Sequence, residues 1–236
     1  LLLDLQRGVH ARIYSADYVS EHWVRESAGR AWLEIPGYGS AELLLPGSGN
    51  TATAYYPHAA LDVYEALAAV AHPALPETLS VYCLPLPRAG LTSSSTAGAR
   101  IFMSPGVLPI PPEVTHMVAT HELGHAMHNR HLPDSDTVSW QVYRNLREIE
   151  DLSVYCADAQ HRNRPHEIFA EDFRYLFGGV LANYSGTIEN AALPAPDAVP
   201  GLYGFLLSLG QGQSLTPAAA GLVASNFPNP FNPQTR

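Results

Sequence analysis

The sequence of 236 residues predicts an α+β fold with a small sheet and several longer helices. Short apolar runs bounded by turn residues predict strands at 31–35, 41–45, 79–84 and 100–104. Longer stretches with apolar side chains three and four residues apart predict helices at 58–71, about 112–129, about 138–157 and 165–177. Hydrophobic residues make up 46% of the chain and charged residues 15%, which is enough apolar material for a packed core.

Turn and capping residues set the ends of these elements. Pro36-Gly37 separates the first two strands, and Pro73 ends the first helix. Pro111-Pro112 opens the next helix, because proline suits a first turn, where its missing N–H would be unpaired anyway. The helix expected at 138–157 has only roughly periodic apolar positions. The last helix ends at Gly178-Gly179 and has an apolar stripe of Phe169, Phe173, Leu176 and Phe177.

The charge balance excludes some classes of protein. There are 13 lysines and arginines against 22 aspartates and glutamates, for a net charge of −9. Such an acidic chain is not expected to bind nucleic acid or to read an anionic membrane surface. No apolar run approaches the roughly 18 residues of a membrane span. We therefore expect a globular protein without a membrane-spanning helix.

Composition divides the chain into four parts. Residues 1–50 are rich in strands and turns, and form either a separate segment or part of the main fold. Residues 51–190 carry the strong helices and form the main domain. Residues 191–224 are rich in Ala, Pro and Gly and are expected to be mostly a linker with a short helix. Residues 225–236 form a separate, turn-rich end.

The segment that carries chemistry is His121-Glu122-Leu123-Gly124-His125, inside the helix that Pro112 opens. Residues i and i+4 of a helix share one face, so His121 and His125 can bind one metal ion together. Glu122 is offset by about 100° around the helix and can reach a metal-bound water instead. This is the H-E-x-x-H arrangement of zinc proteases, in which the glutamate takes a proton from that water. The cofactor expected is one catalytic Zn²⁺.

The third metal ligand has two candidates. His131 falls where the metzincin pattern places its third histidine, but His128 replaces the glycine of that pattern, and no methionine follows His131. Glu167, on the later helix, is the candidate we favour. Glu171 lies one turn beyond it and could fix the tautomer of a ligand histidine, with Asp172 as the fallback for that role.

A resemblance to a known family supports Glu167. The run Glu167-Ile-Phe-Ala-Glu-Asp-Phe-Arg174 resembles the glutamate helix of the lethal-factor-like clan of gluzincins, whose pattern is close to E-F-F-A-E-x-F-R. With the His-Glu-x-Gly-His segment, the resemblance covers roughly residues 100–178. It implies a zincin-like domain with a small sheet, an active-site HExxH helix and a following glutamate-bearing helix. It also implies zinc-dependent peptide hydrolysis, with Glu122 as the general base and residues 51–190 as the catalytic domain.

That family also has a tyrosine before the ligand glutamate that can stabilise the oxyanion. Ser153-Val154-Tyr155 resembles this stretch, although Tyr155 lies several residues farther from Glu167 than the family spacing. We expect Tyr155 to take this role, with His161 as the rival. His116 and His128 are expected to be surface or packing residues, and His166 an N-terminal helix residue. The strand near 101–104 is either an interior strand or an edge strand that could pair with an extended peptide.

The last residues of the chain carry a second resemblance. Ser225-Asn-Phe-Pro-Asn-Pro-Phe-Asn-Pro-Gln234 resembles the opening of the C-terminal sorting domain of the type IX secretion system. It implies a bacterial protein that is secreted or held at the cell surface, and a contact with outer-membrane secretion machinery. The chain would then be truncated within that domain. Cys83 and Cys156 alone are compatible with a disulfide or with two free thiols, and export would favour the disulfide.

Together these interpretations predict a secreted zinc-dependent endopeptidase that acts on peptide or protein substrates. Zinc would be held by His121, His125 and Glu167. The alternative is a secreted, non-catalytic binding module with a structural or degenerate zinc site. Zinc-dependent hydrolysis of a non-peptide amide is a further enzymatic alternative.

Overall fold

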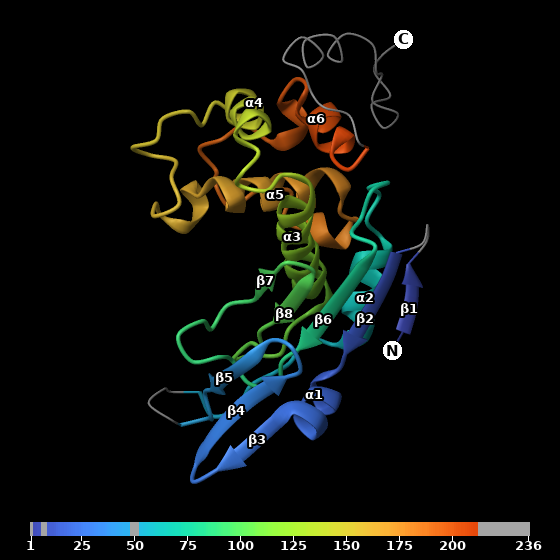
Figure 1. The fold of residues 1–236 in the computed structure, drawn as a ribbon, viewed down its shortest axis with the longest axis vertical. Coiled ribbons are helices and arrows are strands. Elements are labelled where there is room, and N and C mark those ends of the chain that lie inside the picture. The colour runs from blue at the N-terminus through green and yellow to red at the C-terminus, as the bar shows by residue number, and fades with distance from the viewer. Residues whose placement is uncertain (1, 6–8, 48–51, 212–236) are drawn as a thin grey trace.

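The computed structural model describes residues 2–5, 9–47 and 52–211 of the chain. These residues form an α+β fold with two sheets (Figure 1). The main sheet is mixed, because β2, β6 and β8 run parallel while β1 and β7 pair antiparallel at its two edges. Its strand order is β1 (Leu2–Leu5), β2 (Val9–Tyr14), β6 (Thr78–Cys83), β8 (Arg100–Met103) and β7 (Ser95–Ala97).

A second, antiparallel sheet follows the first helix of the chain. It consists of β3 (Val24–Ser27), β4 (Arg30–Ile35) and β5 (Gly39–Leu43). The helices are α1 (Ala16–Trp23), α2 (Ala60–Ala68), α3 (Pro112–His131), α4 (Thr137–Arg147), α5 (Pro165–Phe177) and α6 (Leu202–Ser208). Among the described residues, three short 3₁₀ turns lie between α4 and α6: η1 (His161–Asn163), η2 (Leu181–Asn183) and η3 (Pro196–Ala198).

The main sheet separates two hydrophobic cores. Successive side chains of a strand point to opposite faces, so Val81 enters one core and Tyr82 the other. The larger core contains buried side chains of α2, α3, α5 and α6. The smaller core joins the opposite face to α1, β4 and β5. This arrangement fixes α3 against the sheet, and α5 packs across α3 (Figure 1).

The helix expected at 138–157 is shorter in the structure. α4 ends at Arg147, and Glu148 adopts a left-handed conformation with φ of 57°. Ile149 is buried, whereas Leu152 and Val154 are exposed, so the apolar side chains of this stretch do not share one helical face. Residues 151–159 therefore form turns, and the irregular periodicity has a physical explanation.

Three other expectations are resolved by the packing. The strand near 101–104 is the interior strand β8, since β7 forms the sheet edge beside it. Cys83 and Cys156 are both free, so the disulfide that export would favour is absent. Cys83 lies in the larger core, and burial raises the pKa of its thiol to about 12. Within the stretch 191–224, which was expected to be mostly a linker with a short helix, the helix α6 forms, and the larger core includes Val199, Leu202, Phe205, Leu206 and Leu209.

Two expectations remain predictions. The first is the division of the chain into four parts. The second is the resemblance of residues 225–236 to a sorting domain, because these residues lie outside the described part of the chain. Within the described ranges, no helix has the length and apolar character needed to cross a bilayer.

Candidate metal centre

Three predicted ligand side chains converge between α3 and α5. His121 and His125 come from successive turns of α3, and Glu167 comes from the first turn of α5. The Nε2 atoms of the two histidines are 3.2 Å apart, and Glu167 Oε2 lies 3.2 Å from His121 Nε2 and 3.1 Å from His125 Nε2. Ligand atoms that surround a tetrahedral ion at about 2.0–2.1 Å are roughly 3.3 Å apart. The three atoms therefore have the spacing of one face of a metal tetrahedron.

The close contact of α3 and α5 makes this convergence possible. Gly124 lies between the two ligand histidines, and a Cβ atom added there would be 2.8 Å from Ala170 Cα. Only glycine allows the helix backbones to approach so closely. Pro165 starts α5 at a position that tolerates its missing N–H, which places Glu167 at the helix N-terminus, where the helix dipole favours a carboxylate.

Glu171 orients the first ligand. Its Oε1 lies 2.9 Å from His121 Nδ1, and because a carboxylate only accepts, this nitrogen carries the hydrogen. His121 Nε2 is then free to bind a metal, as predicted from the spacing of Glu171. Arg174 donates to both oxygens of Glu171, at 3.0 and 2.9 Å, and the backbone N–H of Glu189 donates to it at 2.9 Å. Burial opposes ionisation, but His121 and Arg174 lower the pKa of Glu171 to about 2.

The charges of the centre favour a cation. Burial opposes the charged imidazolium, yet Glu167 and Glu171 raise the pKa of His121 to about 10 in the metal-free protein. The pKa of Glu167 is lowered, although burial alone would raise it, because the two histidines stabilise its charge. In the metal-free protein a proton on His121 Nε2 therefore faces the Glu167 carboxylate at 3.2 Å, and a divalent cation can take the place of that proton. The donor set therefore fits a divalent metal ion.

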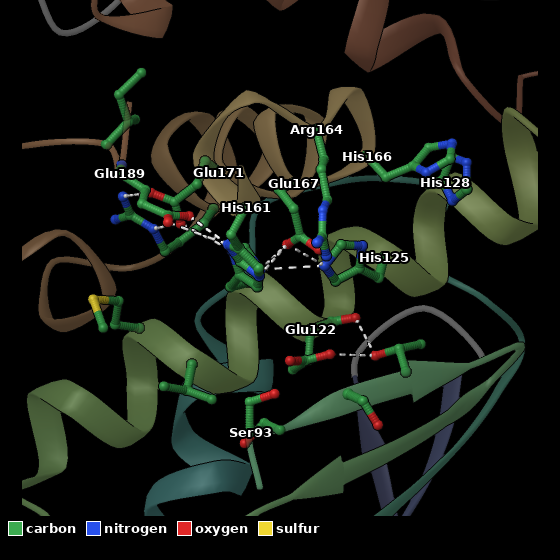
Figure 2. Close-up of a pocket in the computed structure, with 18 of the residues that line it drawn as sticks. Ser93, Glu122, His125, His128, His161, Arg164, His166, Glu167, Glu171 and Glu189 are labelled. Carbon is green, nitrogen blue, oxygen red and sulfur yellow. Dashed lines mark hydrogen bonds and ion pairs between the residues drawn. The ribbon is translucent and has the colours of Figure 1, made fainter. Parts of the chain in front are cut away.

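Glu122 lies in the same cavity but outside the group of three ligands. It is buried, and the hydroxyl of Thr96 in β7 lies 2.7 Å from its Oε2 and 2.9 Å from its backbone oxygen. The cavity has a volume of about 790 Å³ and is lined by α3, β7, the start of α5 and the segment before α6. Figure 2 shows Glu122 on the sheet side of the cavity, and Glu167 and Glu171 on the opposite side. A carboxylate thus lies beside the candidate metal position without being part of it.

The other sequence candidates have different surroundings. His131 packs against Gly210 at the end of α3 and is not part of the group, so the metzincin alternative is not supported. Asp172 is fully buried; its Oδ2 accepts from Tyr143 at 2.7 Å and lies 3.0 Å from Arg147 Nε. Asp172 follows Glu171 directly in α5, so its side chain lies about 100° around the helix from the face that carries Glu167 and Glu171. Tyr155 is half-buried against the larger core and does not line the cavity.

His161, the rival of Tyr155, does line the cavity. Its Nε2 is 3.4 Å from Glu167 Oε2, and its Nδ1 is 2.9 Å from Glu189 Oε2 (Figure 2). The sequence reasoning missed Thr96 and Glu189, whose contacts join segments far apart along the chain. Arg174 was quoted only as the last residue of the glutamate-helix pattern. None of these three had a local sequence signal for its role.

Searches of protein-family models, curated proteins and solved structures found no match to this chain.

Proposed function

We propose that the protein is a secreted, zinc-dependent endopeptidase of the gluzincin type. The observation that carries the proposal is the convergence of His121, His125 and Glu167 beside a buried glutamate, Glu122, in one open cavity. Two histidines and one carboxylate form a common ligand set of catalytic zinc, which leaves a fourth position open. A zinc site with a purely structural role would instead have a closed shell of four protein ligands.

The residues of the centre divide the chemistry among them. His121, His125 and Glu167 would hold the Zn²⁺ ion, which would supply a Lewis acid to polarise a carbonyl and to lower the pKa of water toward about 7. Glu122 accepts the proton of the attacking water and then transfers it to the leaving amine. Thr96 holds the carboxylate of Glu122 in place. Glu171 and Arg174 fix the ring of His121, so that the donor atoms are preorganised.

His161 is better placed than Tyr155 to stabilise the oxyanion. The cavity is lined by His161, and Glu189 holds its ring through Nδ1, which leaves Nε2 directed toward the centre. With Nδ1–H donated to Glu189, Nε2 carries a hydrogen only in the imidazolium form of His161, and that form can donate to the developing charge. The role of Tyr155 stays a prediction that the cavity lining does not support.

A peptide is the substrate class that best suits the cavity. Strand β7 is an edge of the main sheet, and its residues Ser95 and Thr96 line the cavity next to Glu122. An extended peptide can pair with such an edge and place its scissile carbonyl beside the metal. Secretion through the type IX system is supported by the resemblance of residues 225–236 to a sorting domain.

The substitution Glu122→Gln tests the proposal. It keeps the size and the Thr96 contact but removes the base, so we expect kcat to fall by roughly 10²–10⁴ on peptides selected from a random library. Zinc content, measured by elemental analysis, should stay near one tightly bound ion per chain. Glu113→Gln, on the same helix but outside the cavity lining, is the matched control. A zinc-loaded wild type without activity on any peptide would contradict the proposal and favour a binding module.

A further inference from the structure

A second group of metal-ligating side chains lies beside the candidate metal centre. It consists of His128, Asp134 and His166, whose ligand atoms all lie within 4.8 Å of one another. His166 Nε2 is 2.8 Å and His128 Nε2 is 3.4 Å from the same oxygen, Asp134 Oδ1. Figure 2 shows the two histidines side by side, beyond His125. Sequence reasoning treated both as surface, packing or helix-end residues.

Three separate elements supply this group. His128 belongs to the last turns of α3, Asp134 to the turn between α3 and α4, and His166 to the first turn of α5. The described part of the chain contains two groups of this kind, and no residue belongs to both. The two groups are adjacent, because His128 lies one turn after His125 and His166 directly precedes Glu167.

The two rings are held in place before any ion binds. His128 is buried, and its ring packs edge-on against Trp140 at 5.2 Å and lies 4.3 Å from the His166 ring, between centroids. Trp140 also contacts the His166 ring at 5.0 Å. The aromatic packing therefore preorganises both nitrogens.

An ion pair alone does not explain this arrangement. One histidine would suffice to pair with Asp134, whereas here two Nε2 atoms from different helices are directed at one carboxylate oxygen. The Asp134 side chain is 74% exposed, so the open side of the group faces solvent and a hydrated ion can enter. Two imidazoles and one carboxylate suit the divalent ions of borderline softness, with water in the remaining positions.

We propose that His128, Asp134 and His166 form a second binding site for a divalent transition-metal ion such as Zn²⁺. An ion at this site joins the end of α3, the following turn and the start of α5. It thereby holds the first turn of α5, which carries Glu167, against α3. Because Asp134 is exposed, this site binds more weakly than the site of His121, His125 and Glu167. The inference goes beyond the proposed peptidase function and does not depend on it.

A zinc titration of the metal-free, untagged protein tests this inference. Calorimetry is expected to show two equivalents of Zn²⁺ per chain, the second one weaker. In Asp134→Ala and His166→Ala the first equivalent should remain, while the second is lost or its dissociation constant rises at least about 10-fold. Asp158→Ala, which removes another exposed carboxylate, is the matched control and should keep both equivalents. Circular dichroism confirms that each variant is folded.

Cobalt spectroscopy identifies the ligands of each ion. With Co²⁺ as the probe, Glu167→Ala should lose the tight equivalent and keep a visible absorption band that Asp134→Ala abolishes in the same background. The inference is overturned if the wild type binds one equivalent at saturation, or if a second equivalent persists unchanged in both Asp134→Ala and His166→Ala. Lack of peptidase activity, in contrast, would overturn only the proposed function.

Discussion

The hydroxyl of Thr96 is expected to position Glu122, the proposed general base. Thr96 extends from the edge strand β7, and its Oγ1 lies 2.7 Å from Glu122 Oε2. Thr96→Val removes the hydroxyl but keeps a β-branched side chain of nearly the same shape, so the strand should be unchanged. Without the contact, the buried carboxylate of Glu122 can rotate away from the attacking water.

The size of the effect follows from the contact. A hydrogen bond to a charged group contributes roughly 1.5–3 kcal/mol. If this energy is used to hold the base in its reactive position, kcat/KM should fall by roughly 10- to 150-fold in Thr96→Val. Metal content should not change, because Thr96 does not contact His121, His125 or Glu167 in the structure.

The assay compares kcat/KM and zinc content in Thr96→Val and in Thr187→Val. Thr187 lines the same cavity, and its hydroxyl contacts Ser185 rather than Glu122, so the same chemical change there serves as the control. Equal activity in Thr96→Val and the wild type would refute the positioning role. An equal loss in Thr187→Val would refute it too, since the effect would then come from a general change in cavity polarity.

Two further substitutions test the framework of the centre. Gly124→Ala would force the α3 and α5 backbones apart at Ala170. It should lower the free energy of unfolding by about 1–3 kcal/mol and weaken zinc binding. An unchanged zinc affinity would contradict the argument that the two helices must lie this close. In the metal-free protein, His121 and Arg174 hold the pKa of Glu171 at about 2, below its ordinary value of 4.5. Its charged contacts with these two residues therefore stabilise the fold above pH 4.5, and this stabilisation is lost as the pH falls toward 2. The free energy of unfolding lost in Glu171→Gln, measured with denaturant, should therefore be several kcal/mol at pH 7 and shrink toward pH 2, and a pH-independent difference would refute this reading.

Periodic local patterns were sufficient for much of the fold. The helices α2, α3 and α5 and the strands β4, β6 and β8 lie close to the ranges that apolar spacing and proline positions predict. The 138–157 stretch was misassigned because its apolar side chains belong to a helix and to the turns after it. The packed helix α6 was expected within a linker, because its composition resembles a linker and only the contacts of Leu202 and Phe205 show that it is buried.

Local helix geometry was enough to place His121, His125 and Glu122 around α3, since a helix fixes the angle between residues one and four positions apart. It also indicated Glu167 and Glu171 as one face of a second helix. Packing between distant segments was needed to show that the two faces meet, that Glu171 rather than Asp172 contacts His121, and that His161 rather than Tyr155 lines the cavity.

The contact of Thr96 with Glu122 and the group of His128, Asp134 and His166 likewise depend on tertiary structure alone. The physical reason is the same in each case. A helix repeats its geometry locally, so sequence spacing fixes which side chains share a face. The approach of separate elements depends on packing across the whole core, such as the contact of Gly124 with Ala170, and no single segment encodes it.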